Sequence, residues 1–209
     1  MWGVLLFSTA LAELPAPDYR AALLDRIEHE TDRLLENGEP QQALAHIREF
    51  RAEVADDPRL AYEEALVLRH LDRTREAEKL LAVVLQGDPT LAAAWYDLGE
   101  IHLSKNRLDK ARDAFTQATV LTADHPQGWA GPYRLAEIAG FQEDPEAFEG
   151  HLQEALRRGF SFQRTVAGDP RWGAFLEIPA LAAILRQLMT VVGEEEVLES
   201  WSTPGSEIP

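Results

Sequence analysis

Apolar side chains recur along this chain at the spacing of one face of an α-helix, in blocks separated by glycine, asparagine and proline. In the first block, Asp18 can cap the start of a helix and Asn37-Gly38 can end it. The apolar face of that helix consists of Leu23, Leu24, Ile27, Thr31, Leu34 and Leu35. The same pattern predicts further helices over 40–56, 58–71, 73–86, 92–124 (as a pair), 133–139, 145–158, 172–176 and 179–192. We therefore expect an all-α protein.

A second pattern repeats at a longer period. An alanine recurs every 34 residues in the second helix of a predicted pair, at Ala43, Ala77 and Ala111. Twelve residues before each alanine stands a residue that is not large, namely Thr31, Ala65 or Gly99. Small residues on facing helices let the two axes approach closely, because a bulky side chain would hold them apart. The period therefore indicates a repeat of helix pairs.

The third pair carries the residues of a known motif, W-x2-L-G-x2-Y…A-x3-F. The matching residues are Trp95, Leu98, Gly99, Ala111 and Phe115, with His102 at the tyrosine position. The chain thus resembles the tetratricopeptide repeat (TPR) family. This resemblance implies a right-handed α-α superhelix, the TPR solenoid, with regular helix pairs at 24–57, 58–91 and 92–125. An irregular fourth pair is expected at 126–159, so that the repeats together span 18–159.

The region after the repeats has two predicted parts. Residues 160–192 are similar to the closing segments of many bacterial members of the family, with a D-P-x-W-x-x-F element and a P-A-L-x-x-I-L element. Such a segment would cap the last repeat, whose open face would otherwise contact water. Residues 193–209 are acidic and rich in turn formers, so we expect a flexible tail there.

Residues 1–12 form an apolar run that ends in Ala10-Leu11-Ala12, the A-x-A pattern that a signal peptidase cuts. The run is too short to span a bilayer as a helix, and it lacks the usual positively charged leader. A signal peptide, with export to the periplasm, is slightly favoured. The alternative is a cytoplasmic protein in which this N-terminal segment packs on the first helix.

The charge balance disfavours two kinds of partner. The chain has 36 acidic and 20 basic residues, a net charge of -16, and no basic cluster. Such a surface repels phosphate backbones and anionic lipid, so we expect neither nucleic acid nor a membrane surface as the partner. We also expect that the protein itself is not an integral membrane protein. Cysteine is absent, which removes disulfides, thiolate nucleophiles and thiolate zinc sites.

The resemblance also implies where a partner binds. In this family the first helix of each pair lines a concave groove and presents a fixed set of positions to a protein or peptide. In this chain we expect those contacts at Glu28, Asp32, Tyr62, Leu66, Arg69, His70, Tyr96 and Glu100, with Leu103 and Ser104 at further groove positions. Tyrosine and arginine suit such a role because they bury a large area and keep a polar end. The acidic residues favour partners with basic segments. The plainer interpretation is that all of these residues lie on solvated faces of amphipathic helices.

Other chemistries find little support in the sequence. The carboxylate clamp that grips chaperone tails needs Lys and Asn where this chain has Glu28 and Asp32, which would repel that ligand. The six histidines lack the spacing of metal ligands, and His102 is expected to be a packed residue. No nucleotide-binding or nucleophile motif is present, so we expect no cofactor, no metal and no catalytic residue.

We therefore predict a non-enzymatic protein–protein interaction scaffold. One alternative is a hydrolase-like enzyme whose site lies within 129–172, where the repeat is irregular, because irregular insertions can carry function. Another is a purely structural spacer in an envelope assembly.

Overall fold

The computed structural model describes residues 17–53, 57–125 and 128–202, and every regular element in these ranges is helical. The predicted signal segment at 1–12 lies outside them. By its internal contacts the chain divides into unit 1 (Met1–Pro89) and unit 2 (Thr90–Pro209), and each unit is described by itself. The prediction of an all-α fold is confirmed.

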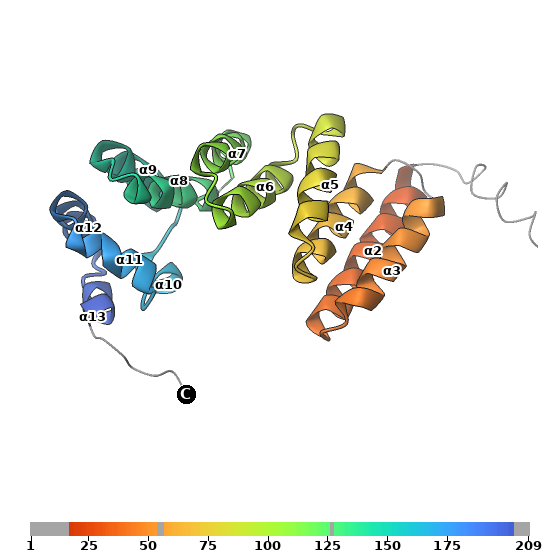
Figure 1. The fold of residues 1–209 in the computed structure, drawn as a ribbon, viewed down its shortest axis with the longest axis horizontal. Helices are drawn as coiled ribbons and strands as arrows, with labels where there is room; N and C mark the ends of the chain where they lie inside the picture. The colour runs from red at the N-terminus through yellow and green to blue at the C-terminus, as the bar shows by residue number, and fades with distance from the viewer. Residues whose placement is uncertain (1–16, 54–56, 126–127, 203–209) are drawn as a thin grey trace, which may run out of the picture. The chain divides into compact units, whose positions relative to one another are not determined.

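Unit 1 consists of two helix pairs, shown from red to yellow in Figure 1. The helices are α2 (Pro17–Glu36), α3 (Pro40–Glu53), α4 (Pro58–His70) and α5 (Thr74–Gly87). Each helix packs against the next along the chain, and α2 also contacts α4. Proline stands at the first position of α4, where its missing N–H costs nothing, and Asp57 caps the helix by accepting a hydrogen bond from Arg59 N at 2.9 Å.

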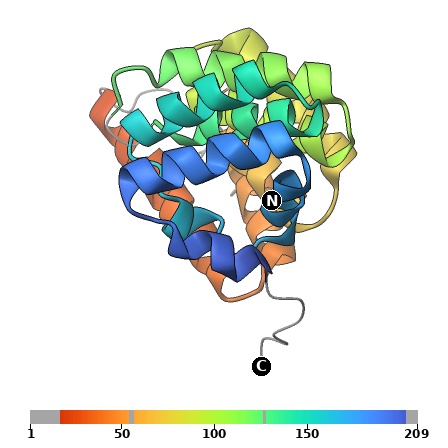
Figure 2. The same cartoon turned by 90° about the vertical axis from the view of Figure 1, so that its left-hand side faces the viewer.

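Unit 2 begins with two further pairs, α6 (Ala92–Ser104) with α7 (Leu108–Leu121) and α8 (Ala130–Phe141) with α9 (Pro145–Arg157). Shorter elements follow: α10 (Phe162–Thr165), α11 (Pro170–Gly173) and the 3-10 helix η1 (Ala174–Glu177). The unit closes with α12 (Pro179–Val192), which lies alongside α9 (Figure 2), and α13 (Glu196–Ser202).

The turn inside each helix pair repeats one backbone conformation. Gly38, Asp72 and Asn106 adopt positive φ angles of 75°, 56° and 52°, and they follow one another at intervals of 34 residues. Glu143 takes the same conformation, with φ 54°, in the fourth pair. It comes 37 residues after Asn106 (143 − 106), so the irregularity predicted for the fourth pair includes three extra residues before its turn.

The small residues predicted at the helix contacts are buried. Ala43, Ala77 and Ala111 are inaccessible to solvent. A Cβ atom added at Gly99 would lie 2.6 Å from Cε1 of Phe115, far inside the normal separation of two carbon atoms. Close approach within the third pair therefore requires the glycine, as the repeat pattern predicts. His102 is also buried, as expected for a packed histidine.

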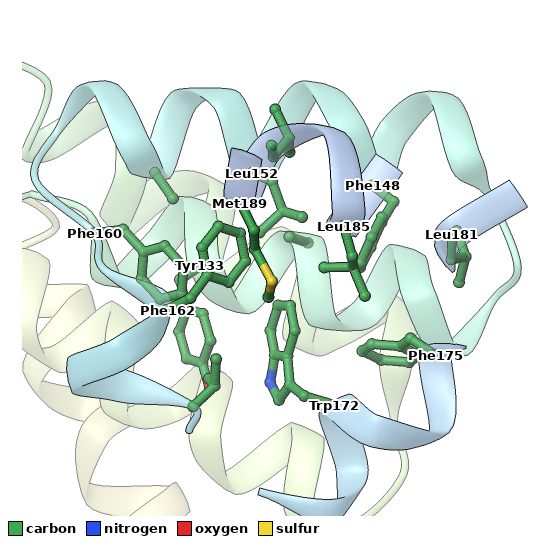
Figure 3. Packing of buried hydrophobic residues seen from close by; sticks show 14 of the residues in the cluster. Tyr133, Phe148, Leu152, Phe160, Phe162, Trp172, Phe175, Leu181, Leu185 and Met189 are labelled. Carbon is green, nitrogen blue, oxygen red and sulfur yellow. The ribbon is translucent and has the colours of Figure 1, made fainter. Parts of the chain in front are cut away.

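An aromatic core joins the fourth pair to the elements that follow it (Figure 3). Its centre is Trp172 of α11, which is 0% exposed. The indole ring stacks on Tyr133 with ring centres 5.5 Å apart, and Phe175 meets it edge-on at 5.4 Å. Residues of α12, including Leu185 and Met189, complete the core. Residues 160–192 thus cover an apolar face of α8 and α9.

The prediction of a flexible tail from residue 193 onward is wrong over 194–202. Glu194 accepts hydrogen bonds from Ser161 Oγ at 2.6 Å and from Phe162 N at 2.7 Å. Val197 of α13 is 1% exposed, and Trp201 Nε1 donates to Val166 O at 2.8 Å. The acidic composition of this segment conceals one apolar face, and the aromatic core provides the surface that buries it.

Within the described part of the chain, no single helix is long and apolar enough to cross a bilayer. One pair bent by 118°, Pro170–Glu177 with Pro179–Val192, meets that condition by length and composition only.

Candidate functional site

In unit 1 the predicted groove residues lie on α2 and α4. Arg59 ties these first helices together: its guanidinium donates to Glu28 Oε1 at 2.6 and 3.0 Å and to Asp25 Oδ1 at 2.8 Å. The hydrogen bonds to these two carboxylates, the one to Asp25 foremost, raise the pKa of Arg59. Glu28 is therefore already paired with a residue of the protein itself. The face formed by α2 and α4 carries less unpaired negative charge than the sequence suggests.

The other predicted residues of unit 1 differ in how much they reach solvent. Asp32 and His70 are exposed, whereas Tyr62, Leu66 and Arg69 are half-buried. All of them belong to α2 or α4, so the structure brings them together on the first helices of one unit.

In unit 2, Tyr96 contributes to packing as well as to the surface. Its ring meets Phe115 edge-on with centres 5.3 Å apart, and it packs against the small core cluster around Ala111. Burial, followed by the nearby charge of Glu100, raises the pKa of the Tyr96 hydroxyl. Tyr96 is therefore a packing residue as well as a predicted groove residue.

Glu100 lines a cavity of about 270 Å³, which lies wholly in unit 2. The walls come from α6 and the turn after it, from the first residue of α7, from α8, and from one residue of α11. The lining residues are Glu100, Leu103, Ser104, Asn106, Leu108, Arg134, Glu137, Phe141 and Arg171. We call this cavity the α6–α8 pocket. Its two main walls are first helices of successive pairs, the elements on which the resemblance places the binding face.

Four charged side chains form a network in the α6–α8 pocket. Arg134 donates to Glu100 Oε2 at 2.9 Å and to Glu137 Oε2 at 2.6 Å. Burial acts to lower the pKa of Arg134, but the charges of Glu100 and Glu137 outweigh it and raise that pKa. Arg171 reaches the other oxygen of Glu137, with Nη1 at 3.3 Å from Oε1. Arg134 therefore stays charged and holds two carboxylates from two helices.

Three of these residues, Arg134, Glu137 and Arg171, are not among the residues predicted from the sequence. Arg134 follows Glu100 by 34 residues, the same interval that separates Asp25 from its partner Arg59. A search for opposite charges one repeat apart would have found both pairs. Glu137 and Arg171 are also opposite charges 34 residues apart, but Arg171 comes from the closing segment, where no further repeat is predicted, so the period gives no reason to pair them.

A second cavity, of about 600 Å³, lies in unit 1 on the second helix α3 and the turn between α4 and α5. Its two arginines are already paired, Arg48 with Glu64 at 2.8 Å and Arg73 with Glu76 at 2.7 Å. Its other lining residues are Gln41, Leu44, Ala45 and Leu71.

The aromatic core fills the interior of the irregular region 129–172. Among residues 17–53, 57–125 and 128–202, no three His, Asp or Glu side chains gather so as to hold a metal ion.

These features define a helical repeat protein: the helix pairs stack, small residues lie inside each pair, and ion pairs join residues one repeat apart. Two sequence models of the tetratricopeptide repeat match the chain, one over residues 30–92 and the other over 68–131. The chain is a tetratricopeptide repeat protein.

Solved structures support this assignment at the level of the fold. MamA (41-end) from Desulfovibrio magneticus RS-1 is similar with a TM-score of 0.62 and 18% identity, over 83% of this chain and 95% of that one. PilF from Pseudomonas aeruginosa is similar with a TM-score of 0.64 and 15% identity, over 87% of this chain and 90% of that one. No curated protein sequence matches the chain. At these identities the similarity concerns the fold alone.

Proposed function

We propose that this protein is a non-enzymatic scaffold that binds a protein or peptide segment on the faces of its first helices, α2 and α4 in unit 1 and α6 and α8 in unit 2. The tetratricopeptide repeat is a fold of protein–protein interaction scaffolds. The observation that supports a binding role for these faces in this chain is the α6–α8 pocket, a concave charged site between first helices of successive pairs.

The partner expected for these faces carries basic segments. The net charge of -16 favours such a partner during encounter. Exposed acidic residues also lie on the first helices, among them Asp32 and Glu36 of α2. Tyr62 and Arg69 of α4 would then supply the buried contacts, since half-buried aromatic and arginine side chains are favoured anchors at interfaces.

A hydrolase-like activity in the irregular region is the weaker interpretation. Its strongest support would be the charged groups of the α6–α8 pocket, but Arg134 binds two carboxylates there, and the hydroxyl of Ser104 donates to Ile101 O at 3.0 Å. Catalysis by a nucleophile requires a base within reach of that nucleophile. Paired carboxylates and guanidinium groups fit recognition better than that chemistry.

Charge substitutions on exposed positions test the proposal without disturbing the core. The test variant carries Asp32→Lys and Ser104→Lys, both on first helices. The control variant carries Glu49→Lys and Thr116→Lys, which make the same change in net charge on the second helices α3 and α7. Protein captured from native extract by the unmodified chain is identified and then quantified with both variants.

We expect the test variant to lose the captured partner and the control variant to keep it. Both variants change the net charge equally, so the long-range electrostatic attraction to the partner changes equally in both. A difference in captured partner between the two variants therefore shows which helices contact it. Equal retention by both variants would contradict a binding role for the first helices.

A further inference from the structure

One oxygen of the buried Glu137 carboxylate lacks a hydrogen-bond donor among the described residues. This side chain is 0% exposed and lines the α6–α8 pocket. One of its oxygens, Oε2, accepts from Arg134. The other, Oε1, accepts no hydrogen bond from any described residue, although Arg171 Nη1 lies 3.3 Å away. A buried carboxylate oxygen without a donor is costly, so a donor brought in by a ligand would be strongly favoured.

The arginines of the pocket are committed to other partners. Arg134 is shared between Glu137 and Glu100, with its Nε 2.6 Å from Glu100 Oε1. Arg171 is 55% exposed and is held by Asp169, which accepts from Nη2 at 2.7 Å and from Nε at 3.2 Å. Three carboxylates thus share two guanidinium groups, which leaves one negative charge in excess. A third cation would balance the site, whereas an added anion would meet Glu100 and Glu137.

The remaining walls suit the stem and the head of a long basic side chain. Leu103 and Leu108 offer apolar surface along which a methylene stem can lie. The ring of Phe141 is 44% exposed and also lines the pocket, where its face can attract a cation. Ser104 uses its hydroxyl proton on Ile101 O, so its oxygen remains an acceptor.

We propose that the α6–α8 pocket is a subsite for one lysine or arginine side chain of the bound protein, with the ammonium or guanidinium group donating to Glu137 Oε1. The volume of about 270 Å³ lies just below the range of roughly 300–1,000 Å³ typical of small-molecule sites, and it suits a single side chain. This subsite rests on the proposed function, because it takes its occupant from a partner that contacts α6 and α8.

Amino-acid amides test the subsite on the full chain without a known partner. The probes are Nα-acetyl-arginine amide and Nα-acetyl-lysine amide. Nα-acetyl-citrulline amide serves as the neutral match of the arginine probe, and Nα-acetylglycine as a carboxylate. Binding is followed by NMR through the side-chain amide of Asn106 and the backbone amide of Ser104, two residues that line the pocket. Only binding that shifts these signals counts as occupancy of the pocket.

We expect both cationic probes to shift these signals in a saturable manner, with the arginine probe at least about tenfold tighter than the citrulline probe, since a hydrogen bond to a charged group is worth that factor or more. Glu137→Gln should remove about the same factor. Glu154→Gln is the matched control, because Glu154 also forms ion pairs with two arginines, Arg157 and Arg158, but belongs to α9. It should leave binding unchanged.

If Glu137→Gln does not fold, Phe141→Ala provides a second test, because Phe141 is exposed and its removal should not disturb folding. Loss of the ring should weaken the binding of the cationic probes about two- to fivefold. Equal binding of citrulline and arginine probes, preference for Nα-acetylglycine, or no shift of the pocket signals with any probe would each overturn the subsite. If the first-helix charge substitutions still release the native partner in that case, the proposed function stands and only the subsite fails.

Discussion

Gly99 is the position at which the repeat pattern makes its sharpest prediction about stability. A Cβ atom at this position would lie 2.6, 2.8 and 2.8 Å from Cε1, Cδ1 and Cζ of Phe115. The ring cannot easily move away, because Phe115 is 0% exposed and packs against Tyr96. Gly99→Ala should therefore strain the contact between α6 and α7.

The size of the effect follows from two opposing contributions. Overpacking a close contact costs roughly 1–3 kcal/mol. Alanine in place of glycine inside a helix recovers roughly 0.5–1 kcal/mol. We expect the free energy of unfolding to fall by about 1–2 kcal/mol. Gly150→Ala, in α9, is the control, because nothing lies within 4 Å of its added Cβ and only the stabilising contribution applies.

Urea unfolding followed by tryptophan fluorescence measures both variants, since Trp95, Trp129, Trp172 and Trp201 all lie in unit 2. With a urea dependence near 2 kcal/mol per molar, the midpoint for Gly99→Ala should fall by about 0.5–1 M, and that for Gly150→Ala should rise. The same glycine substitution should cost much less in a Phe115→Leu background, where the ring is gone. An unchanged or raised midpoint for Gly99→Ala, or an equal cost in both backgrounds, would refute the reasoning.

Three further predictions concern the fourth helix pair. Glu143→Gly should raise the free energy of unfolding by about 0.5–1 kcal/mol in urea titrations, because φ 54° strains any residue with a Cβ, whereas Gln153→Gly in the body of α9 should lower it. Burial, with the nearby charge of Glu137, raises the pKa of Tyr133 to about 12 from its ordinary 10. The unfolded chain then loses its proton first, so the free energy of unfolding should fall as the pH rises from about 10 towards 12. Tyr133→Phe should flatten this pH dependence in unfolding curves. Burial, aided by the charge of Arg112, lowers the pKa of His151 below its ordinary 6.5. As the pH falls below about 6.5 the unfolded chain therefore binds the proton first, and the stability of the folded protein should decline. Thermal unfolding of His151→Gln should show a smaller decline in stability over the same pH range.

The helix pairs could be predicted because their signals are local or strictly periodic. The alanine that recurs at Ala43, Ala77 and Ala111 identifies the second helix of each pair. The turn at Asn37-Gly38 can be recognised from glycine alone. Asp72 and Asn106 stand at the equivalent turn positions one and two repeats later, so the period also accounts for their positive φ.

The rest of the candidate site depends on contacts that no local pattern encodes. Arg171 comes from the closing segment and reaches Glu137 across 34 positions of sequence, in a stretch where the repeat period no longer holds. Burial of Glu137 follows from the pairing with Arg134 and the packing around α8. The last helix could not be predicted for a similar reason: its acidic composition resembles that of a disordered tail, whereas distant contacts, among them those of Glu194, Val197 and Trp201, stabilise it.

Site-specific photo-crosslinking in native extract tests the central claim most directly. A photoreactive side chain at exposed Asp32 or Ser104 reports on the first helices, and the same group at exposed Glu49 or Thr116 reports on the second helices. Our account predicts covalent adducts with one and the same partner from the first-helix positions and none from the second-helix positions. Adducts formed only from Glu49 and Thr116, or equally from all four positions, would contradict it.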